Sequence, residues 1–248
     1  MTIQDEKYVC VLDTETSGLT GKDRIIEFGL IVLDEDSNVV YRGSDYCSIP
    51  FELSHEVSEY TGIKNSDLID AKKIKDTPTY HEFMKYNNKN NRVVIHNSWF
   101  DLYMLYLSHI KVECQIIDTL NCARYEYTLD SYSLESIMNN VVKKSDTKTY
   151  VQKHRAIDDC EDLLSVLHCL MKNNTLTALV KMTDKVIIGF GKYKGKLWTD
   201  LDKGYLKWVH DKFAQENSPT QLYVKSLLKM EMNPQQKKMA EYLHIISA

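Results

Sequence analysis

KYVCVLDTET, residues 7–16, decides the fold, because it is a short apolar run that ends in two acidic residues. Its apolar, β-branched centre predicts a buried strand over residues 7–13. Side chains two apart on a strand point to the same face, so we expect the carboxylates of Asp13 and Glu15 to project together from the edge of a sheet. For this pair alone, solvated acids at a strand end are the simpler interpretation.

The elements around this strand predict an α/β fold. Further strands are expected at residues 24–33, 39–47, 92–96 and 115–118, and helices at 54–61, 80–86, 102–110, 119–125 and 155–171. The first three strands follow one another, which is typical of an antiparallel meander. Later strands alternate with helices, so the sequence predicts a mixed β-sheet flanked by helices.

Two later motifs add carboxylates and a histidine. HNSWFD, residues 96–101, follows a predicted strand and places Asp101 in the first turn of a helix, where capping alone is a sufficient reason for it. HRAIDD, residues 154–159, opens the longest predicted helix. Asp159 shares the apolar stripe of that helix, whereas Asp158 falls on its polar face. His154 precedes the stripe and is expected on the preceding loop, able to swing over metal ions.

Carboxylates gathered from separate segments predict a metal site. Like charges held close are costly unless a cation neutralises them, and oxygen ligands suit Mg²⁺ or Mn²⁺. A core-facing Asp159 needs a partner, and a metal ion shared with Asp13 would supply one. Two such ions bridged by carboxylates form a template for displacement at phosphorus, and a histidine can deprotonate the attacking water.

In this order the motifs resemble those of the DnaQ-like exonucleases of the DEDDh type. VLDTETSGL, VVIHNSWFDL and HRAIDD resemble the three family motifs, and the likeness spans roughly residues 7–174. The resemblance implies a ribonuclease H-like fold. It also implies a 3′→5′ exonuclease that releases nucleoside 5′-monophosphates from DNA, with single strands or 3′ ends as partners.

The resemblance assigns roles to individual residues. Two Mg²⁺ ions, with Mn²⁺ as a substitute, would be held by Asp13, Glu15, Asp101 and Asp159. His154 would be the general base. The terminal nucleotide would be bound by Thr14, Thr16, Leu19, Asn97 and Phe100. None of the five catalytic residues is missing, which argues against an inactive binding module of this fold.

The C-terminal quarter of the chain differs in charge from the rest. Residues 181–248 hold 12 lysines and 7 acidic residues, a net of +5, whereas residues 1–180 hold 19 basic and 28 acidic residues, a net of −9. The overall charge of −4 therefore conceals a basic region. The glycine-containing stretch after NNTLTALVKMTD, residues 173–184, leads us to interpret those twelve residues as a connector. We expect an exonuclease domain at residues 1–176 and a small module at 184–248.

The module carries FGKYKG, residues 190–195, and resembles the C-terminal extension of exodeoxyribonuclease X. Lys192, Lys194 and Lys196 alternate with aromatic residues and are candidate contacts for nucleic acid. A solvated lysine face is the simpler alternative. Most of the aromatic side chains are expected to build the core of so small a module.

Composition excludes several other classes. A hydrophobic content of 43% with a small net charge argues against disorder, and no apolar run is long enough to cross a bilayer. The first ten residues lack the pattern of an export signal, and the six cysteines lack metal-ligand spacing. We expect a cytoplasmic protein with free thiols and no membrane partner.

Two other functions stay open at this point. A 3′→5′ exoribonuclease of the same family would use the same residues on RNA, and no residue in the sequence reports on a 2′-hydroxyl. A polymerase-associated proofreading or nucleic-acid-binding subunit would use the fold as a scaffold. A folded C-terminus with glycines and aromatics fits substrate binding better than a docking tail.

Overall fold

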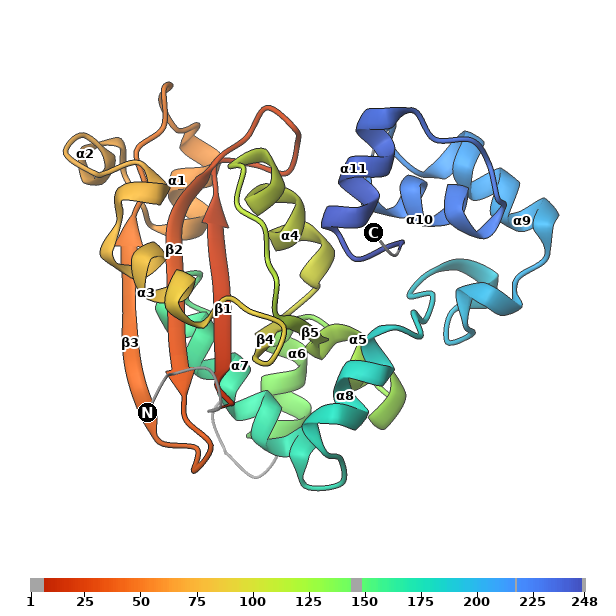
Figure 1. Ribbon diagram of the computed structural model, residues 1–248, viewed down its shortest axis with the longest axis horizontal. Coiled ribbons are helices and arrows are strands. Elements are labelled where there is room, and N and C mark those ends of the chain that lie inside the picture. Colours follow the sequence, from red (N-terminus) through yellow and green to blue (C-terminus); the bar gives the residue numbers. More distant parts are fainter. Residues whose placement is uncertain (1–6, 144–148, 217, 247–248) are drawn as a thin grey trace.

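Five strands form one mixed sheet in the order β3-β2-β1-β4-β5 (Figure 1). The computed structural model describes residues 7–143, 149–216 and 218–246. The strands are β1 (Val9–Thr16), β2 (Ile25–Leu33), β3 (Val39–Tyr46), β4 (Arg92–Ile95) and β5 (Gln115–Asp118). β1, β2 and β3 pair antiparallel, whereas β4 and β5 continue the sheet in parallel with β1. The predicted meander and mixed sheet are confirmed.

Several of the helices before residue 184 begin at a residue whose side chain caps the first turn. They are α1 (His55–Thr61), α2 (Asn65–Leu68), α3 (Pro78–Tyr86), α4 (Ser98–Leu107), α5 (Thr119–Glu126), α6 (Leu134–Ile137), α7 (Ala156–Met171) and α8 (Leu176–Thr183). The side chains of Ser54, Thr77 and Asp118 accept backbone N–H groups at the starts of α1, α3 and α5. The predicted helices are confirmed, although α4 begins four residues earlier than expected.

Side chains of the central strands alternate between two hydrophobic clusters. Cys10 and Leu12 of β1 join a cluster with α3 and α4, whereas Val9 and Val11 join a second cluster with α5 and α7. This period of two is the period of a strand. All nine residues of β2 are buried, as in a central strand that is covered on both faces. The sheet is therefore the middle layer of three.

The expected connector at residues 173–184 is wrong, because this stretch contains helix α8. Leu179 is fully buried in the second cluster, and the hydroxyl of Thr183 accepts the backbone N–H of Asp118 at 2.8 Å. The sequence was misleading because polar Asn and Thr residues surround a helix with only one fully buried side chain. Residues 176–183 thus pack against β5 and α5.

The C-terminal region is helical and packs beside α4 (Figure 1). Its helices are α9 (Lys203–Trp208), α10 (Pro219–Leu227) and α11 (Pro234–Tyr242). A third cluster holds Ile188, Trp198, Leu201, Leu206, Val209, Tyr223 and Val224. Leu222, Met239 and Leu243 instead belong to the cluster that contains α4 and one face of the sheet. The division between residues 1–176 and 184–248 stays a prediction.

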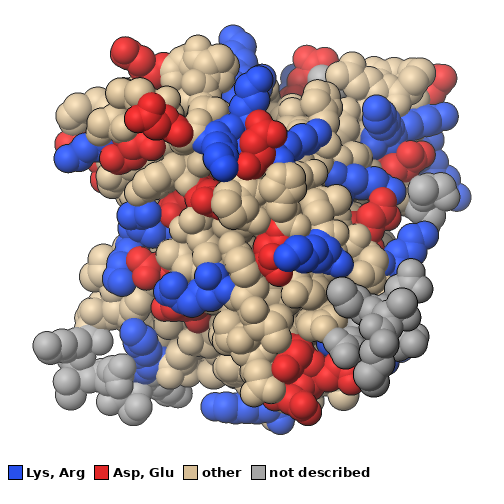
Figure 2. Space-filling model, turned by 60° about the vertical axis from the view of Figure 1, so that its left-hand side comes forward, with Lys and Arg blue, Asp and Glu red and all other residues tan. Residues whose placement is uncertain are grey.

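Charge and cysteines add little to this architecture. On the face shown in Figure 2, basic and acidic side chains are interspersed. The six cysteines, all in described segments, are free thiols, as predicted. Among residues 7–143, 149–216 and 218–246, no helix is both long and apolar enough to span a bilayer.

Candidate active site

The end of β1 supplies the first pair of carboxylates. Glu15 is 8% exposed, and Asp13 is partly buried two residues before it. The pairing of β1 with β2 shifts register between Glu15 and Thr16, so the strand departs from a regular ladder beside these carboxylates. Both side chains line one cleft, which agrees with the predicted shared face.

Asp101 reaches the same cleft from the first turn of α4. It is 3% exposed, and the hydroxyl of Thr14 donates to its Oδ1 at 2.7 Å. The turn before α4 depends on Asn97, which has φ 58°. The carboxylate of Asp118 accepts the backbone N–H groups of Asn97 at 3.2 Å and of Ser98 at 3.0 Å. Asp118 therefore fixes the direction in which α4 starts.

Asp159 reaches the cleft from α7 and is 2% exposed. Gln152 donates its side-chain N–H to Asp159 Oδ2 at 2.7 Å, whereas the buried Oδ1 has no hydrogen-bond partner among the residues that the structure describes. Asp158 is instead partly exposed and pairs with Lys153 at 3.2 Å. The predicted orientations of the two neighbouring aspartates are confirmed. A buried carboxylate oxygen without a partner is costly unless a cation binds it.

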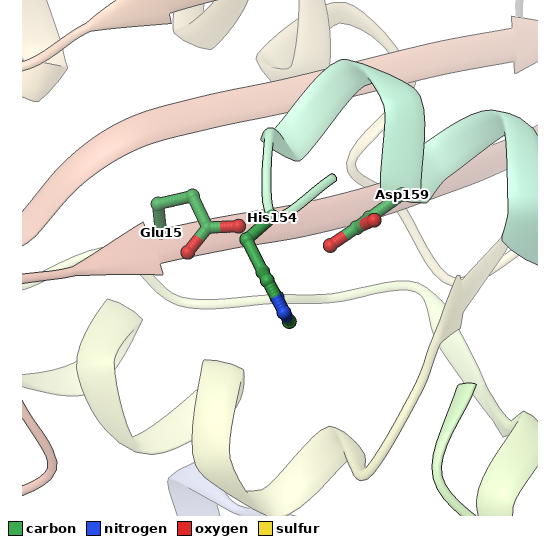
Figure 3. Close-up of side chains that lie close together, drawn as sticks. All are labelled: Glu15, His154 and Asp159. Atoms are coloured by element: carbon green, nitrogen blue, oxygen red, sulfur yellow. The ribbon is translucent and has the colours of Figure 1, made fainter. Parts of the chain in front are cut away.

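His154 lies outside α7, as expected, with φ 53°. Its ring stacks on Tyr60, with centroids 4.0 Å apart and an interplanar angle of 29°. Ligand atoms of Glu15, His154 and Asp159 all lie within 4.8 Å of one another (Figure 3). Asp13 and Asp101 line the same cleft outside this group of three.

A buried ion pair that sequence reasoning missed holds this segment to the sheet. Glu27 of β2 is 1% exposed and accepts two N–H groups of Arg155, both at 3.1 Å. It also accepts the backbone N–H of Ala156 at 3.1 Å. A Cβ atom at Gly29 would lie 2.6 Å from the Ala156 carbonyl carbon, so the glycine permits this close approach. The signal in the sequence was the single acid within RIIEFGLIVL, residues 24–33.

Burial raises the pKa of all four carboxyls. The pKa of Glu15 rises to about 8, first from burial and then from the charge of Asp159. Burial raises the pKa of Asp101 and of Asp159 to about 7 each. Burial and the charges of Asp101 and Asp159 also raise the pKa of Asp13 well above its usual range. Four buried carboxyl groups with raised pKa values form an environment that favours divalent cations.

Burial lowers the pKa of His154, so its imidazole is neutral at neutral pH. A neutral imidazole is the form that can accept a proton. His96 also lines the cleft, but its two ring nitrogens are hydrogen-bonded to Thr119 at 2.9 Å and to the Tyr132 carbonyl at 3.0 Å. We therefore interpret His96 as a structural residue.

The cleft brings together every residue that the sequence analysis placed at the catalytic centre. Its volume is about 590 Å³, and its predicted lining residues are Asp13, Thr14, Glu15, Thr16, Leu19, Asn97, Phe100, Asp101, His154 and Asp159. Sequence reasoning missed Tyr60 and Gln152, which contact His154 and Asp159. For Tyr60 the available signal was YTGI, residues 60–63, whereas Gln152 carried none.

The three candidate lysines lie away from this cleft. Lys194 donates to the carbonyl oxygen of Asp130 at 2.9 Å, which links the C-terminal region to the loop before α6. The ammonium groups of Lys192 and Lys196 lie 4.7 and 5.6 Å from the ring centroid of Tyr193. Their role in binding nucleic acid stays a prediction.

Comparison with known families gives a match over most of the sheet-containing region. The family model described as Exonuclease (RNase_T) matches residues 10–167. Among curated proteins, DNA polymerase III PolC-type of Bacillus cereus is 29% identical over 167 residues, which cover 64% of this chain and 11% of that protein. The same protein of Bacillus subtilis strain 168 is 28% identical over 179 residues, 69% of this chain and 12% of that protein. The chain thus spans about a tenth of these relatives.

Solved structures share the fold at low identity. Exonuclease X in complex with 5′ overhanging duplex DNA superposes with a TM-score of 0.56 at 21% identity, covering 71% of this chain and 99% of that chain. The nuclease domain of 3′hExo, a DEDDh family member bound to rAMP, gives a TM-score of 0.53 at 18% identity. This match covers 68% of this chain and 94% of that chain. These similarities agree with the expected ribonuclease H-like fold.

Proposed function

The chain belongs to the Exonuclease (RNase_T) family, and on that premise we propose that it is a DnaQ-like nuclease of the DEDDh type that degrades DNA from the 3′ end. The proposed products are nucleoside 5′-monophosphates. The main support is the buried Oδ1 of Asp159, which lacks a hydrogen-bond partner beside Glu15 and His154. Such an oxygen suits a cation in the cleft better than it suits an inactive scaffold.

The acidic residues fit the divalent cations that this family generally uses. We propose two Mg²⁺ ions, with Mn²⁺ as a substitute, held by Asp13, Glu15, Asp101 and Asp159. Oxygen donors are the ligands that these ions prefer. The positive charge of the ions would offset both the burial and the mutual repulsion that raise the carboxyl pKa values. When bound, the ions would stabilise negative charge that develops on the phosphate oxygens.

His154 is the proposed general base. Its lowered pKa keeps the imidazole neutral, and the stacked ring of Tyr60 limits its rotation. The imidazole takes a proton from water as that water attacks the terminal phosphorus. The bond from phosphorus to the 3′ oxygen breaks, and that oxygen gains a proton from solvent. The released nucleotide keeps the phosphate on its 5′ oxygen.

Side chains around the carboxylates are the proposed contacts of the terminal nucleotide. Leu19 is 77% exposed at the rim, and Phe100 lines the cleft near it, so both can pack against a base. Asn97, Thr14 and Thr16 offer polar groups in the same cleft. We favour DNA over RNA as the substrate because the curated relatives are DNA polymerases. The experiment below compares the two substrates directly.

The test uses DNA and RNA single strands and duplex DNA, each labelled at either the 5′ or the 3′ end. With Mg²⁺, a 3′ label should appear at once as a mononucleotide, whereas a 5′ label should pass through a ladder of shortened strands. EDTA should stop both reactions. Early release of a 5′ label as mononucleotide would reverse the proposed polarity, and faster loss from RNA would replace DNA as the substrate.

A further inference from the structure

Four aromatic rings of the C-terminal region form a continuous stack that ends at the surface. Phe190 and Phe213 have centroids 4.3 Å apart at 22°, and Phe213 and Trp208 have centroids 6.0 Å apart at 28°. Tyr205 continues the stack 5.5 Å from Trp208 at 28°. Trp208 is 48% exposed and Phe213 is 51% exposed. Because single large rings are usually buried, two neighbouring exposed rings indicate a binding surface.

The sequence of α9 and the residues after it places these rings outside. Leu206 and Val209 are three residues apart on one helical face and are buried in the third cluster. Trp208 lies outside that face, whereas Trp198 is 4% exposed and belongs to the third cluster. The prediction that most aromatics of the module build its core holds for Trp198, and Trp208 is an exception. Trp208 and Phe213 therefore keep about half of their surface open to solvent.

A lysine lies beside the stack because of a glycine turn. Gly191 has φ 65°, and a Cβ atom there would lie 2.9 Å from the Tyr205 hydroxyl oxygen. The turn directs Lys192 over the Tyr205 ring, with Nζ 5.6 Å from its centroid. Lys192, Tyr205 and Trp208 line one surface hollow together with Asp202, whose carboxylate already accepts the Tyr193 hydroxyl and the Tyr205 N–H, both at 2.8 Å.

A second hollow adjoins the catalytic cleft and has one wall in the C-terminal region. Leu19, Asn97 and Phe100 line both the cleft and a hollow of about 370 Å³. The C-terminal wall of that hollow consists of residues 215, 216 and 218–220. This wall begins two residues after Phe213. A strand that leaves the cleft past Phe100 would therefore meet the C-terminal region that carries the aromatic stack.

We propose that Trp208 and Phe213, with Lys192, bind single-stranded nucleic acid outside the catalytic cleft by stacking on its bases. Exposed rings accept bases of any sequence, and a neighbouring ammonium group neutralises a phosphate. The net charge of +5 on residues 181–248 complements such a strand. The inference rests on the proposed function, because the bound strand is the one whose end lies in the cleft.

The test measures the affinity of the full chain for a long fluorescent single strand in EDTA, which prevents hydrolysis. Trp208→Ala and Phe213→Ala should each weaken binding about tenfold. Trp208→Tyr, which keeps a ring, should retain most of the affinity. Phe51→Ala is the matched control, because Phe51 is 43% exposed outside the stack, and it should bind as the unchanged protein does. Equal affinity of Trp208→Ala and the unchanged protein would overturn the proposal.

Two further measurements keep the proposal separate from folding and catalysis. Bases that stack on Trp208 should quench the indole fluorescence of the unchanged protein, and the part of the quenching that comes from Trp208 should be lost in Trp208→Tyr. Lys192→Gln should reduce the slope of log affinity against log salt by about one, whereas Lys89→Gln should not. Hydrolysis of a trinucleotide by the unchanged protein tests the proposed function alone, because this substrate is too short to leave the cleft.

Discussion

At the scale of single residues, neighbouring aspartates on α7 have opposite environments. Successive residues on a helix are about 100° apart, so Asp159 faces the cleft while Asp158 faces solvent. Asp159 accepts one hydrogen bond from Gln152 and has an unpartnered oxygen, whereas Asp158 pairs with Lys153. The two side chains have the same chemistry and differ only in what surrounds them.

This pair provides the first prediction. Asp159→Asn should lower the rate of nucleotide release by at least ~100-fold, because an amide in place of the carboxylate weakens the proposed cation site. Asp158→Asn should remain near the original rate, because an exposed ion pair contributes little. Steady-state release of mononucleotides from a 3′-labelled strand measures both variants. If both variants lose activity equally, Asp159 has no special role in the reaction.

The residues proposed for the catalytic centre could be brought to one cleft from the sequence because each stands in a short motif near a strand end or a helix start. Glu27 could not, because its role depends on Arg155, which is 128 residues away in the chain. Tyr60 depends in the same way on its contact with His154, whereas Gln152 contacts Asp159 only seven residues along the chain. Local patterns indicate where a side chain projects, but they do not indicate which distant side chain it meets.

At the scale of elements, the contact between β2 and the start of α7 determines where His154 and Asp159 lie. His154 directly precedes Arg155, and Asp159 follows it by one helical turn. The guanidinium of Arg155 pairs with the buried carboxylate of Glu27. The same guanidinium lies 5.2 Å from the ring centroid of Tyr46 on β3. The meander strands therefore position a loop that comes much later in the chain.

The second prediction concerns this ion pair. Arg155→Met should destabilise the fold by about 1–3 kcal/mol, since it leaves the Glu27 carboxylate buried without its cation. It should also lower kcat more than it changes KM, because the proposed base is displaced. Arg155→Lys should retain only part of the stability and only part of the kcat. A lysine ammonium group cannot donate two parallel hydrogen bonds to a carboxylate as a guanidinium does. Urea unfolding and steady-state kinetics provide the measurements.

A double variant tests whether the pair acts as a unit. Glu27→Gln combined with Arg155→Met should cost less stability than the two single changes added together, because the second change removes a partner that is already lost. Additive effects would show that Glu27 and Arg155 contribute independently.

The strands were predicted more reliably than the C-terminal helices. Apolar runs such as RIIEFGLIVL identify buried strands without any tertiary information. α8 was missed because its packing against β5 depends on tertiary contacts of Leu179 and Thr183, and because the polar residues 173–175 precede it. The C-terminal packing was missed because charge and composition do not reveal that Met239 and Leu243 join the cluster of α4.

At the scale of the whole molecule, the acidic cleft links stability to pH and to metal ions. Without metal, Glu15 with a pKa of about 8 and Asp159 with a pKa of about 7 hold protons in the folded state, whereas unfolded carboxyls titrate near ~4. Protonation therefore favours the fold, and this contribution is lost as pH rises from about 5 through 8.

The third prediction follows from this linkage. In EDTA the thermal midpoint should fall between pH 6 and pH 8, by about 2–4 °C for each kcal/mol lost. Mg²⁺ should restore the midpoint at pH 8 and have less effect at pH 6, where protons occupy the carboxyls. Calorimetry at both pH values measures this. Equal stabilisation by Mg²⁺ at both values would contradict the linkage.

The fourth prediction concerns the joint packing of the C-terminal region. A chain that ends after Lys185 would expose the cluster around α4, because Leu222, Met239 and Leu243 cover it. Three such side chains contribute ~1.5–3 kcal/mol each, so the midpoint should fall by about 10 °C or more. Thermal unfolding with an apolar dye measures the loss. An unchanged midpoint would show that residues 1–185 fold independently.

The position of Leu222, Met239 and Leu243 also has a consequence for biosynthesis. The ribosome releases the N-terminal strands first, and domains usually begin to fold in that order. Here the surface of α4 is covered by side chains from residues 222–243. The sheet can assemble early in translation, but this part of the core is completed only after residues 222–243 have left the ribosome.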